Sequence, residues 1–187
     1  MTVVLFEPHL DDAVLFASYT LLQHRPVVVT VLGDNRVQER YGITSDVRRR
    51  EHASAMRVLG IESAVWAFRD DIQDWDEISD SVGSLRNGAH LYAEITQVWA
   101  PLPEVRGHEQ HTAIAQIVER TFDRSITSFY ATYRRGDRRT RTETEVIPEP
   151  HWPALKMRAM ACYTSQINLE NTRPWFAADD MLREWVA

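Results

Sequence analysis

The segment that most constrains the fold is Val3-Val4-Leu5-Phe6-Glu7-Pro8-His9-Leu10-Asp11-Asp12, near the amino terminus. The four apolar residues at its start predict a short, buried strand. Pro8 has no backbone N–H with which to extend a strand ladder, so the strand is expected to end there. The helical pattern of residues 13–17 follows. A strand joined to a helix by polar side chains predicts an open α/β sheet, in which ligands bind at the carboxyl edge.

Three polar side chains of this segment lie within four positions of one another. The spacing of His9 and Asp12 suits two ligands of one metal ion, and Asp11 is left beside them without an evident structural role. A second interpretation is that Asp11 or Asp12 caps the helix, a position for which aspartate is well suited. Taken alone, the motif fits both interpretations.

A second polar cluster, Gly107-His108-Glu109-Gln110-His111, precedes another helical pattern at residues 112–118. A single histidine is usually a surface residue or a hydrogen-bonded core residue, but two at this spacing before a helix favour a site. Together the clusters offer His, Asp and His. Catalytic zinc uses three ligands of this kind and leaves one position open for water.

The two clusters in combination resemble the metal motifs of the PIG-L/LmbE-like family of zinc-dependent N-deacetylases. Two helical patterns resemble the same family: Arg48-Arg49-Arg50-Glu51 followed by Leu59-Gly60, and Lys156 and Ala159 followed by Tyr163-Thr164-Ser165-Gln166. The resemblance runs from residue 3 to about residue 166. The paired metal motifs carry its specificity, and the helical patterns support it.

This resemblance implies one Rossmann-like α/β domain over residues 1–187, with a mostly parallel sheet flanked by helices and a C-terminal hairpin and helices. The sequence pattern predicts strands at residues 3–6, 26–32, 64–68, 98–99, 126–131 and, as a charged edge strand, 140–147. Helices are expected at 11–24, 48–59, 78–85, 112–122 and 153–161, with helical spacing again at 181–186. Thr44 or Ser45 can cap the helix whose body is 48–59, and Gly60 is expected to end it. The basic run Arg134–Arg139 is expected at a hairpin tip, and residues 33–35 in a polar loop.

The resemblance also implies a catalytic arrangement. Zinc, or another divalent metal, would be held by His9, Asp12 and His111, with metal-bound water as the nucleophile. Asp11 would be the general base, and His108 would hydrogen-bond the developing oxyanion.

The implied substrate is an amino-sugar conjugate of the N-acetylglucosamine type, from which the enzyme would remove the N-acetyl group. Arg48 is an implied substrate contact because its fork of donors grips oxygen atoms, and Asp70 an implied contact for sugar hydroxyls. Arg106, just before the second motif, is a candidate contact for an anionic substrate, although an exposed arginine needs no ligand. An amidase for a non-sugar amide and a non-catalytic binding protein on the same fold remain alternatives.

Three positions depart from the family pattern. Glu109-Gln110 replaces the usual Pro-Asp, which removes a charge that could keep His108 protonated. Ala13 replaces a frequent glutamate, and Phe16-Ala17 replaces a glycine-rich helix start. We expect bulk at Phe16 to reshape the acyl pocket.

Composition limits the remaining classes. A net charge of −6 over 187 residues argues against general nucleic-acid or membrane-surface binding. The single cysteine, Cys162, excludes an internal disulfide framework and fits a reducing compartment. No signal-peptide pattern and no apolar run of about 20 residues is evident, so a cytoplasmic location is expected. The aromatic residues of the tail, from Trp175 to Trp185, predict packing onto the domain or a contact in a homo-oligomer.

Overall fold

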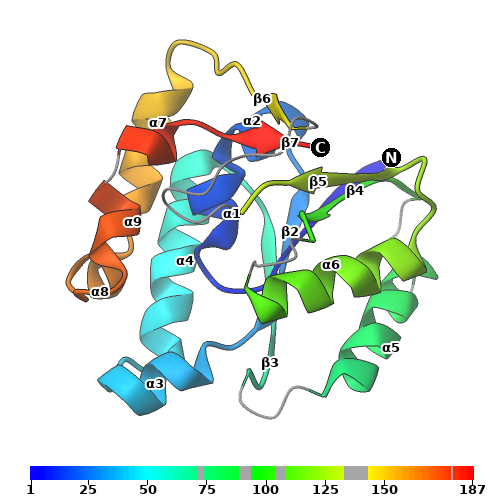
Figure 1. Ribbon diagram of the computed structural model, residues 1–187, viewed down its shortest axis with the longest axis horizontal. Helices are drawn as coiled ribbons and strands as arrows, with labels where there is room; N and C mark the ends of the chain where they lie inside the picture. The colour runs from blue at the N-terminus through cyan, green and yellow to red at the C-terminus, as the bar shows by residue number, and fades with distance from the viewer. Residues whose placement is uncertain (71–73, 89–93, 104–107, 133–142, 178) are drawn as a thin grey trace.

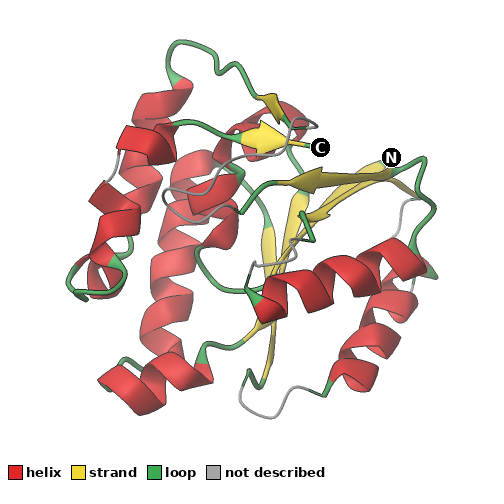
Figure 2. Ribbon diagram, in the orientation of Figure 1, coloured by secondary structure: helices red, strands yellow, loops and turns green. Residues whose placement is uncertain are grey.

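The computed structural model describes residues 1–70, 74–88, 94–103, 108–132, 143–177 and 179–187 (Figure 1). A seven-stranded sheet runs through this part of the chain in the order β3-β2-β1-β4-β5-β7-β6 (Figure 2). Strands β1 to β5 are parallel, and β7 pairs antiparallel with β5 and β6. The prediction of a mostly parallel α/β sheet is therefore confirmed. The strands are β1 (Thr2–Glu7), β2 (Val27–Leu32), β3 (Ser63–Phe68), β4 (Ile95–Pro101), β5 (Thr127–Tyr130), β6 (Thr144–Glu145) and β7 (Trp185–Val186).

Helices cover both faces of this sheet (Figure 2). They are α1 (Asp12–Phe16), α2 (Ser18–His24), α3 (Asn35–Tyr41), α4 (Ser45–Leu59), α5 (Trp75–Arg86), α6 (Glu109–Thr121), α7 (Trp152–Met160), α8 (Thr164–Ile167), α9 (Arg173–Ala177) and the 3-10 helix η1 (Asp179–Leu182). Helix α4 begins and ends as the sequence predicts. Thr44 accepts a hydrogen bond from the backbone N–H of Val47, and Gly60 adopts a φ of 67° after the last turn, a conformation that glycine adopts without strain.

Two hydrophobic clusters lie on opposite faces of the sheet, because successive strand residues point to opposite sides. Leu5 and Val28 pack with apolar residues of α1, α2, α4 and α7. Val4 and Phe6 pack on the other face, with residues of α5 and α6. Burial on both faces explains why the first two strands read as nearly continuous apolar runs.

The order of the strands places a crevice beside β1. The chain runs from β1 to β2 on one side and later to β4 on the other, so the strand order reverses at β1. In open α/β sheets the crevice outside the carboxyl ends of the strands at such a point is the usual ligand site. The loop after β1 and the start of α6, which carry the two polar clusters, both lie at this edge (Figure 1).

Several elements differ from the prediction. The expected helix at 11–24 is interrupted at Ala17, and the expected polar loop at 33–35 leads directly into α3. Of the tail residues 181–186, only Met181 and Leu182 are helical, as the end of η1. Val186 pairs with Tyr130 and Thr144, so Trp185–Val186 becomes a strand inside the sheet. In the described part of the predicted edge strand only Thr144–Glu145 is a strand, and Arg134–Arg139 lie outside the described residues. Among the described residues, no helix combines the length and apolar character that crossing a membrane requires.

Candidate active site

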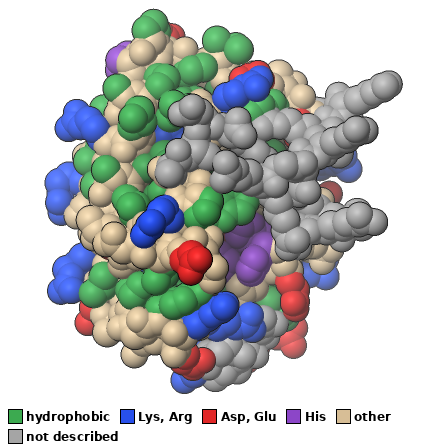
Figure 3. Space-filling model, turned by 60° about the vertical axis from the view of Figure 1, so that its left-hand side comes forward, with side chains coloured by type: hydrophobic (Ala, Val, Ile, Leu, Met, Phe, Trp, Pro, Cys, Tyr) green, Lys and Arg blue, Asp and Glu red, His purple; other side chains and the backbone are tan. Residues whose placement is uncertain are grey.

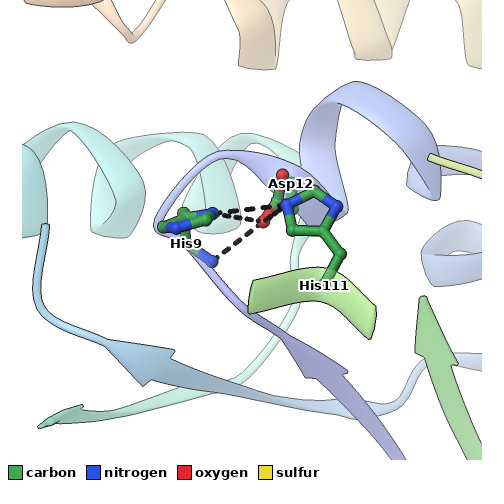
Figure 4. A group of neighbouring side chains, drawn as sticks. All are labelled: His9, Asp12 and His111. Carbon is green, nitrogen blue, oxygen red and sulfur yellow. Dashed lines mark hydrogen bonds and ion pairs between the residues drawn. The ribbon is translucent and has the colours of Figure 1, made fainter. Parts of the chain in front are cut away.

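Three donor atoms from distant parts of the chain converge at the carboxyl edge of the sheet (Figure 4). Oδ2 of Asp12 lies 3.1 Å from Nδ1 of His9 and 3.1 Å from Nε2 of His111, and the two nitrogens are 3.3 Å apart. His9 is in the loop after β1, Asp12 begins α1, and His111 is in the first turn of α6. The same Asp12 oxygen accepts the backbone N–H of His9 at 2.9 Å, which holds the carboxylate toward the loop.

The three atoms fit a divalent metal ion of the size of zinc. Tetrahedral zinc binds nitrogen and oxygen at about 2.0–2.1 Å, which places neighbouring donor atoms about 3.3 Å apart. The three observed separations of 3.1 to 3.3 Å match one triangular face of that tetrahedron. Two imidazoles and one carboxylate are also a donor set that suits zinc and leaves its fourth position open.

Neighbouring side chains fix which nitrogen of each histidine faces this point. Gln110 is 2% exposed, and its amide Nε2 donates to the backbone carbonyl of Asp70 at 3.0 Å. Because that carbonyl only accepts, the amide oxygen of Gln110 must face His9, and it accepts from Nε2–H of His9 at 2.7 Å. Nδ1 of His9 is then left for the metal. In the same way Nδ1 of His111 lies 3.0 Å from the hydroxyl of Thr132, which leaves its Nε2 for the metal.

The pKa shifts of His9 and Asp12 show that this point favours positive charge. Burial by itself lowers the pKa of His9, but the hydrogen bond and charge of Asp12 outweigh it and raise the pKa to about 10. Burial raises the pKa of Asp12, but the charge and hydrogen bond of His111, together with His9, bring it well below its ordinary value. The ionised carboxylate of Asp12 therefore holds a proton on the His9 imidazole until a cation replaces it.

Asp11 lies beside the metal point and is held by a buried arginine. Nη2 of Arg48 is 3.0 Å from Oδ2 of Asp11 and 2.9 Å from Oδ2 of Asp34, which also accepts from Nε of Arg48 at 2.9 Å. Burial raises the pKa of Asp11, Arg48 opposes that shift, and the charges of Asp12 and Asp34 add to it. The Asp11 side chain is 14% exposed, so it reaches the solvent side of the site.

Arg48, which the sequence analysis gives as an implied substrate contact, is buried. Its side chain is 2% exposed, its third neighbour is Glu51 with Oε2 at 3.5 Å from Nη1, and the ring of Tyr163 lies against it at 5.6 Å. Glu51 in turn accepts the backbone N–H and the hydroxyl of Ser165, both at 2.6 Å. The guanidinium is thus enclosed by carboxylates and an aromatic ring, and it positions Asp11 instead of reaching into open space.

Asp70, an implied contact for sugar hydroxyls, is also buried. It is 3% exposed, and its carboxylate accepts the backbone N–H of Arg36 in the first turn of α3 at 3.2 and 3.3 Å. The structure therefore gives it a role in joining α3 to the end of β3. Arg106 lies outside the described residues.

His108 stands at the entrance to α6 and borders the same site. Its ring centroid is 5.2 Å from that of His9 and 5.0 Å from that of His111. Nδ1 of His108 accepts the backbone N–H of Gln110 at 3.3 Å, so neutral His108 carries its hydrogen on Nε2. The side chain of Gln110 bonds to His9 and to the Asp70 carbonyl.

A cavity of about 260 Å³ opens beside these groups. Its lining includes the three donor residues together with Asp11, His108 and Thr132. Leu15 and Phe16 of α1 and Thr172, Trp175 and Phe176 around α9 line the same cavity. Figure 3 shows histidine side chains at the surface with hydrophobic side chains beside them.

Sequence reasoning missed Thr132 and the aromatic wall of this cavity. Thr132 follows β5 at the same carboxyl edge as the first motif, so a polar residue after a strand was the available signal. Trp175 and Phe176 gave no such signal, because an aromatic pair in a tail is the usual mark of packing.

The chain belongs to the PIG-L family, whose model, described as GlcNAc-PI de-N-acetylase, matches residues 4–122. Similar solved structures cover nearly the whole chain. A deacetylase triple mutant involved in the teicoplanin biosynthetic pathway is 18% identical over 100% of this chain and 98% of its own, with a TM-score of 0.74. The N,N'-diacetylchitobiose deacetylase from Pyrococcus horikoshii is 17% identical over 96% and 72%, with a TM-score of 0.64.

A structure with a different chemistry is also similar. The 4-carboxy-2-hydroxymuconate hydratase from Pseudomonas putida is 12% identical over 100% of this chain and 95% of its own, with a TM-score of 0.64. At these identities the likeness shows the fold alone, so the function must be argued from the site. No curated protein sequence matches the chain.

Proposed function

We propose that this protein is a zinc-dependent N-deacetylase that removes the acetyl group from an amino-sugar conjugate of the N-acetylglucosamine type. The observation that carries the proposal is the convergence of His9, Asp12 and His111 on one point, with the carboxylate of Asp11 alongside and not among the three donors. Membership of the PIG-L family and the two similar deacetylases support the same reaction. We further propose that residues 1–187 act as one catalytic domain in the cytoplasm.

An amide resists water because its carbonyl is a weak electrophile and its nitrogen a poor leaving group. When bound, zinc supplies Lewis acidity, which polarises the carbonyl and lowers the pKa of water toward about 7. Asp11 takes a proton from the attacking water as its oxygen bonds to the carbonyl carbon. Asp11 then returns the proton to the amide nitrogen as the C–N bond breaks, giving acetate and the free amine.

The remaining residues stabilise and orient. Nε2–H of His108 hydrogen-bonds the oxyanion that develops on the carbonyl oxygen, since its Nδ1 is occupied by the backbone N–H of Gln110. Arg48 keeps Asp11 aimed at the water through a guanidinium bridge to Asp34. Burial, which raises the pKa of Asp11, favours a carboxyl group that can both accept and return a proton.

The experiment combines metal analysis with a substrate panel. Purified protein is analysed for zinc and incubated with N-acetylglucosamine, its conjugates and simple non-sugar acetamides, and released amine is measured. We expect His111→Ala to lose zinc and activity. We expect Asp11→Ala to keep zinc and lose about 10²–10⁴ in rate. Glu109 is an exposed acid that lies between His108 and His111 in the sequence. Glu109→Ala is therefore the matched control and should keep zinc and activity.

Three results separate the alternatives. Amine release only from non-sugar amides would indicate an amidase of another class. Zinc binding without release from any compound would indicate a binding protein. Equal release by the wild type and by Asp11→Ala would refute the assigned role of Asp11, and an Asp11→Ala protein without zinc would contradict its separation from the metal ligands.

A further inference from the structure

The lining of the cavity beside the metal point combines two kinds of side chain. Histidines and carboxylates surround the metal point, whereas α1 and α9 also contribute the apolar Leu15, Phe16, Trp175 and Phe176, which we call the α1–α9 wall. Thr172 lines the cavity beside these residues, and its hydroxyl donates to the backbone carbonyl of Gln166. The α1–α9 wall therefore offers carbon surface to a ligand.

The aromatic residues of this wall hold one another in place. The rings of Phe16 and Trp175 meet edge to face, with centroids 6.0 Å apart and an interplanar angle of 75°. Phe176 packs against buried Tyr163 at 5.6 Å. Such aromatic contacts favour fixed ring positions, so the surface is preformed.

The volume exceeds what an acetyl group requires. A cavity of about 260 Å³ corresponds to about nine water molecules at their share of liquid volume. Water against Leu15 and Phe16 lacks hydrogen-bond partners, so an apolar group that displaces it gains affinity. Sugar hydroxyls pressed on the same wall would lose hydrogen bonds to water without replacing them.

We propose that the α1–α9 wall is a subsite for an apolar group of the substrate, an aliphatic or aromatic group larger than the methyl of acetyl. The substrate is then an amide that carries such a group within reach of the metal point, either as its acyl chain or as an aglycone of its sugar. This inference rests on the proposed function for the position of the amide. The chemistry of the wall is independent of that function.

Two series of compounds test it and distinguish the two sources. One series varies the acyl group on glucosamine through acetyl, butanoyl, hexanoyl and benzoyl. The other keeps N-acetylglucosamine and varies the aglycone through methyl, butyl, hexyl and benzyl. Affinity is measured by calorimetry on the zinc-loaded Asp11→Ala protein, so that binding is read without turnover, and kcat/KM is measured on the wild type.

We expect affinity to rise about fourfold for each added methylene group that enters the cavity, in one of the two series. Trp175→Ala should remove most of the gain for hexanoyl or hexyl compounds and leave the acetyl or methyl compounds nearly unchanged. Trp175→Phe should restore it. Trp66→Ala is the matched control, since Trp66 is half-buried in the cluster on the opposite face of the sheet.

The outcomes separate this inference from the proposed function. Chain-length-dependent binding without hydrolysis of any compound would support the subsite and refute the deacetylase. Hydrolysis of acetyl and methyl compounds with no gain in either series would support the deacetylase and overturn the subsite. A gain that Trp175→Ala leaves intact would also overturn it, because the apolar group would then lie elsewhere.

Discussion

Replacing Gln110 by leucine tests how the metal centre is built. In the structure the Gln110 amide is fixed by the Asp70 carbonyl, and its oxygen accepts Nε2–H of His9 at 2.7 Å. Leucine has nearly the same volume but no acceptor. The tautomer of His9 with its hydrogen on Nε2 then loses its hydrogen-bond acceptor. The tautomer with the hydrogen on Nδ1, which points at Asp12, becomes favoured.

The size of the effect follows from the bond that is lost. To bind zinc through Nδ1, His9 in the variant must leave Nε2–H without a partner in a largely buried place. An unsatisfied buried donor costs about 1–3 kcal/mol, and the lower half of that range applies because the His9 side chain is 16% exposed. About 1.4 kcal/mol is tenfold, so we expect zinc affinity to fall about 5- to 30-fold, which overlaps the range of about 10–100-fold typical of such outer partners.

Zinc affinity is measured by competition with a chelator of known affinity. Long-range ¹H–¹⁵N spectra of the histidine rings report which nitrogen carries the hydrogen. Zinc-loaded wild type should show His9 protonated at Nε2 and His111 protonated at Nδ1. Gln116→Leu, an exposed glutamine on the same helix, is the matched control. Unchanged zinc affinity in Gln110→Leu, or spectra that show Nε2 of His9 bound to zinc, would refute the reasoning.

Three further predictions concern buried charge. Lys156→Met should lower the free energy of unfolding, measured in urea, by about 3–5 kcal/mol. Lys156 and Glu184 are buried with Nζ and Oε1 2.7 Å apart, so the variant leaves the carboxylate unpaired. Combining Lys156→Met with Glu184→Leu should recover part of this loss, and an additive loss would contradict the pairing. Burial lowers the pKa of His52 to about 4 from 6.5, so between these pH values the unfolded chain binds a proton that the folded chain does not. The stability that His52 contributes is therefore full above pH 6.5 and falls by about 3 kcal/mol as the pH drops toward 4. His52→Gln should flatten this part of the plot of unfolding free energy against pH, and an unchanged slope would exclude His52 as its source. Arg48→Lys should keep zinc but lower kcat about tenfold with little change in KM, because an ammonium cannot reproduce the bridge that fixes Asp11; a rise in KM at constant kcat would indicate a substrate contact instead.

The sequence alone determined the elements whose signal is local. Val3 to Phe6 and the run after Pro26 predicted buried parallel strands because a strand covered on both faces must be apolar at every position. Thr44 and Gly60 marked the ends of α4 through the chemistry of capping. His9, Asp12 and His111 stood out because residues of their kinds, at their spacing, follow strand ends and precede helices. These strands, helix ends and candidate ligands could be recognised without knowing which distant residues they contact.

Tertiary structure decided every feature that depends on which segments become neighbours. Gln110 reads as a departure from a motif, and only the position of the Asp70 carbonyl orients its amide toward His9. Arg48 reads as a ligand for substrate oxygen, and only folding encloses it among carboxylates. Trp175 reads as packing until α9 lies across from α1. The physical reason is that a side chain's type records what it is able to contact, whereas the partner it meets is set by packing over the whole chain, which local pattern does not encode.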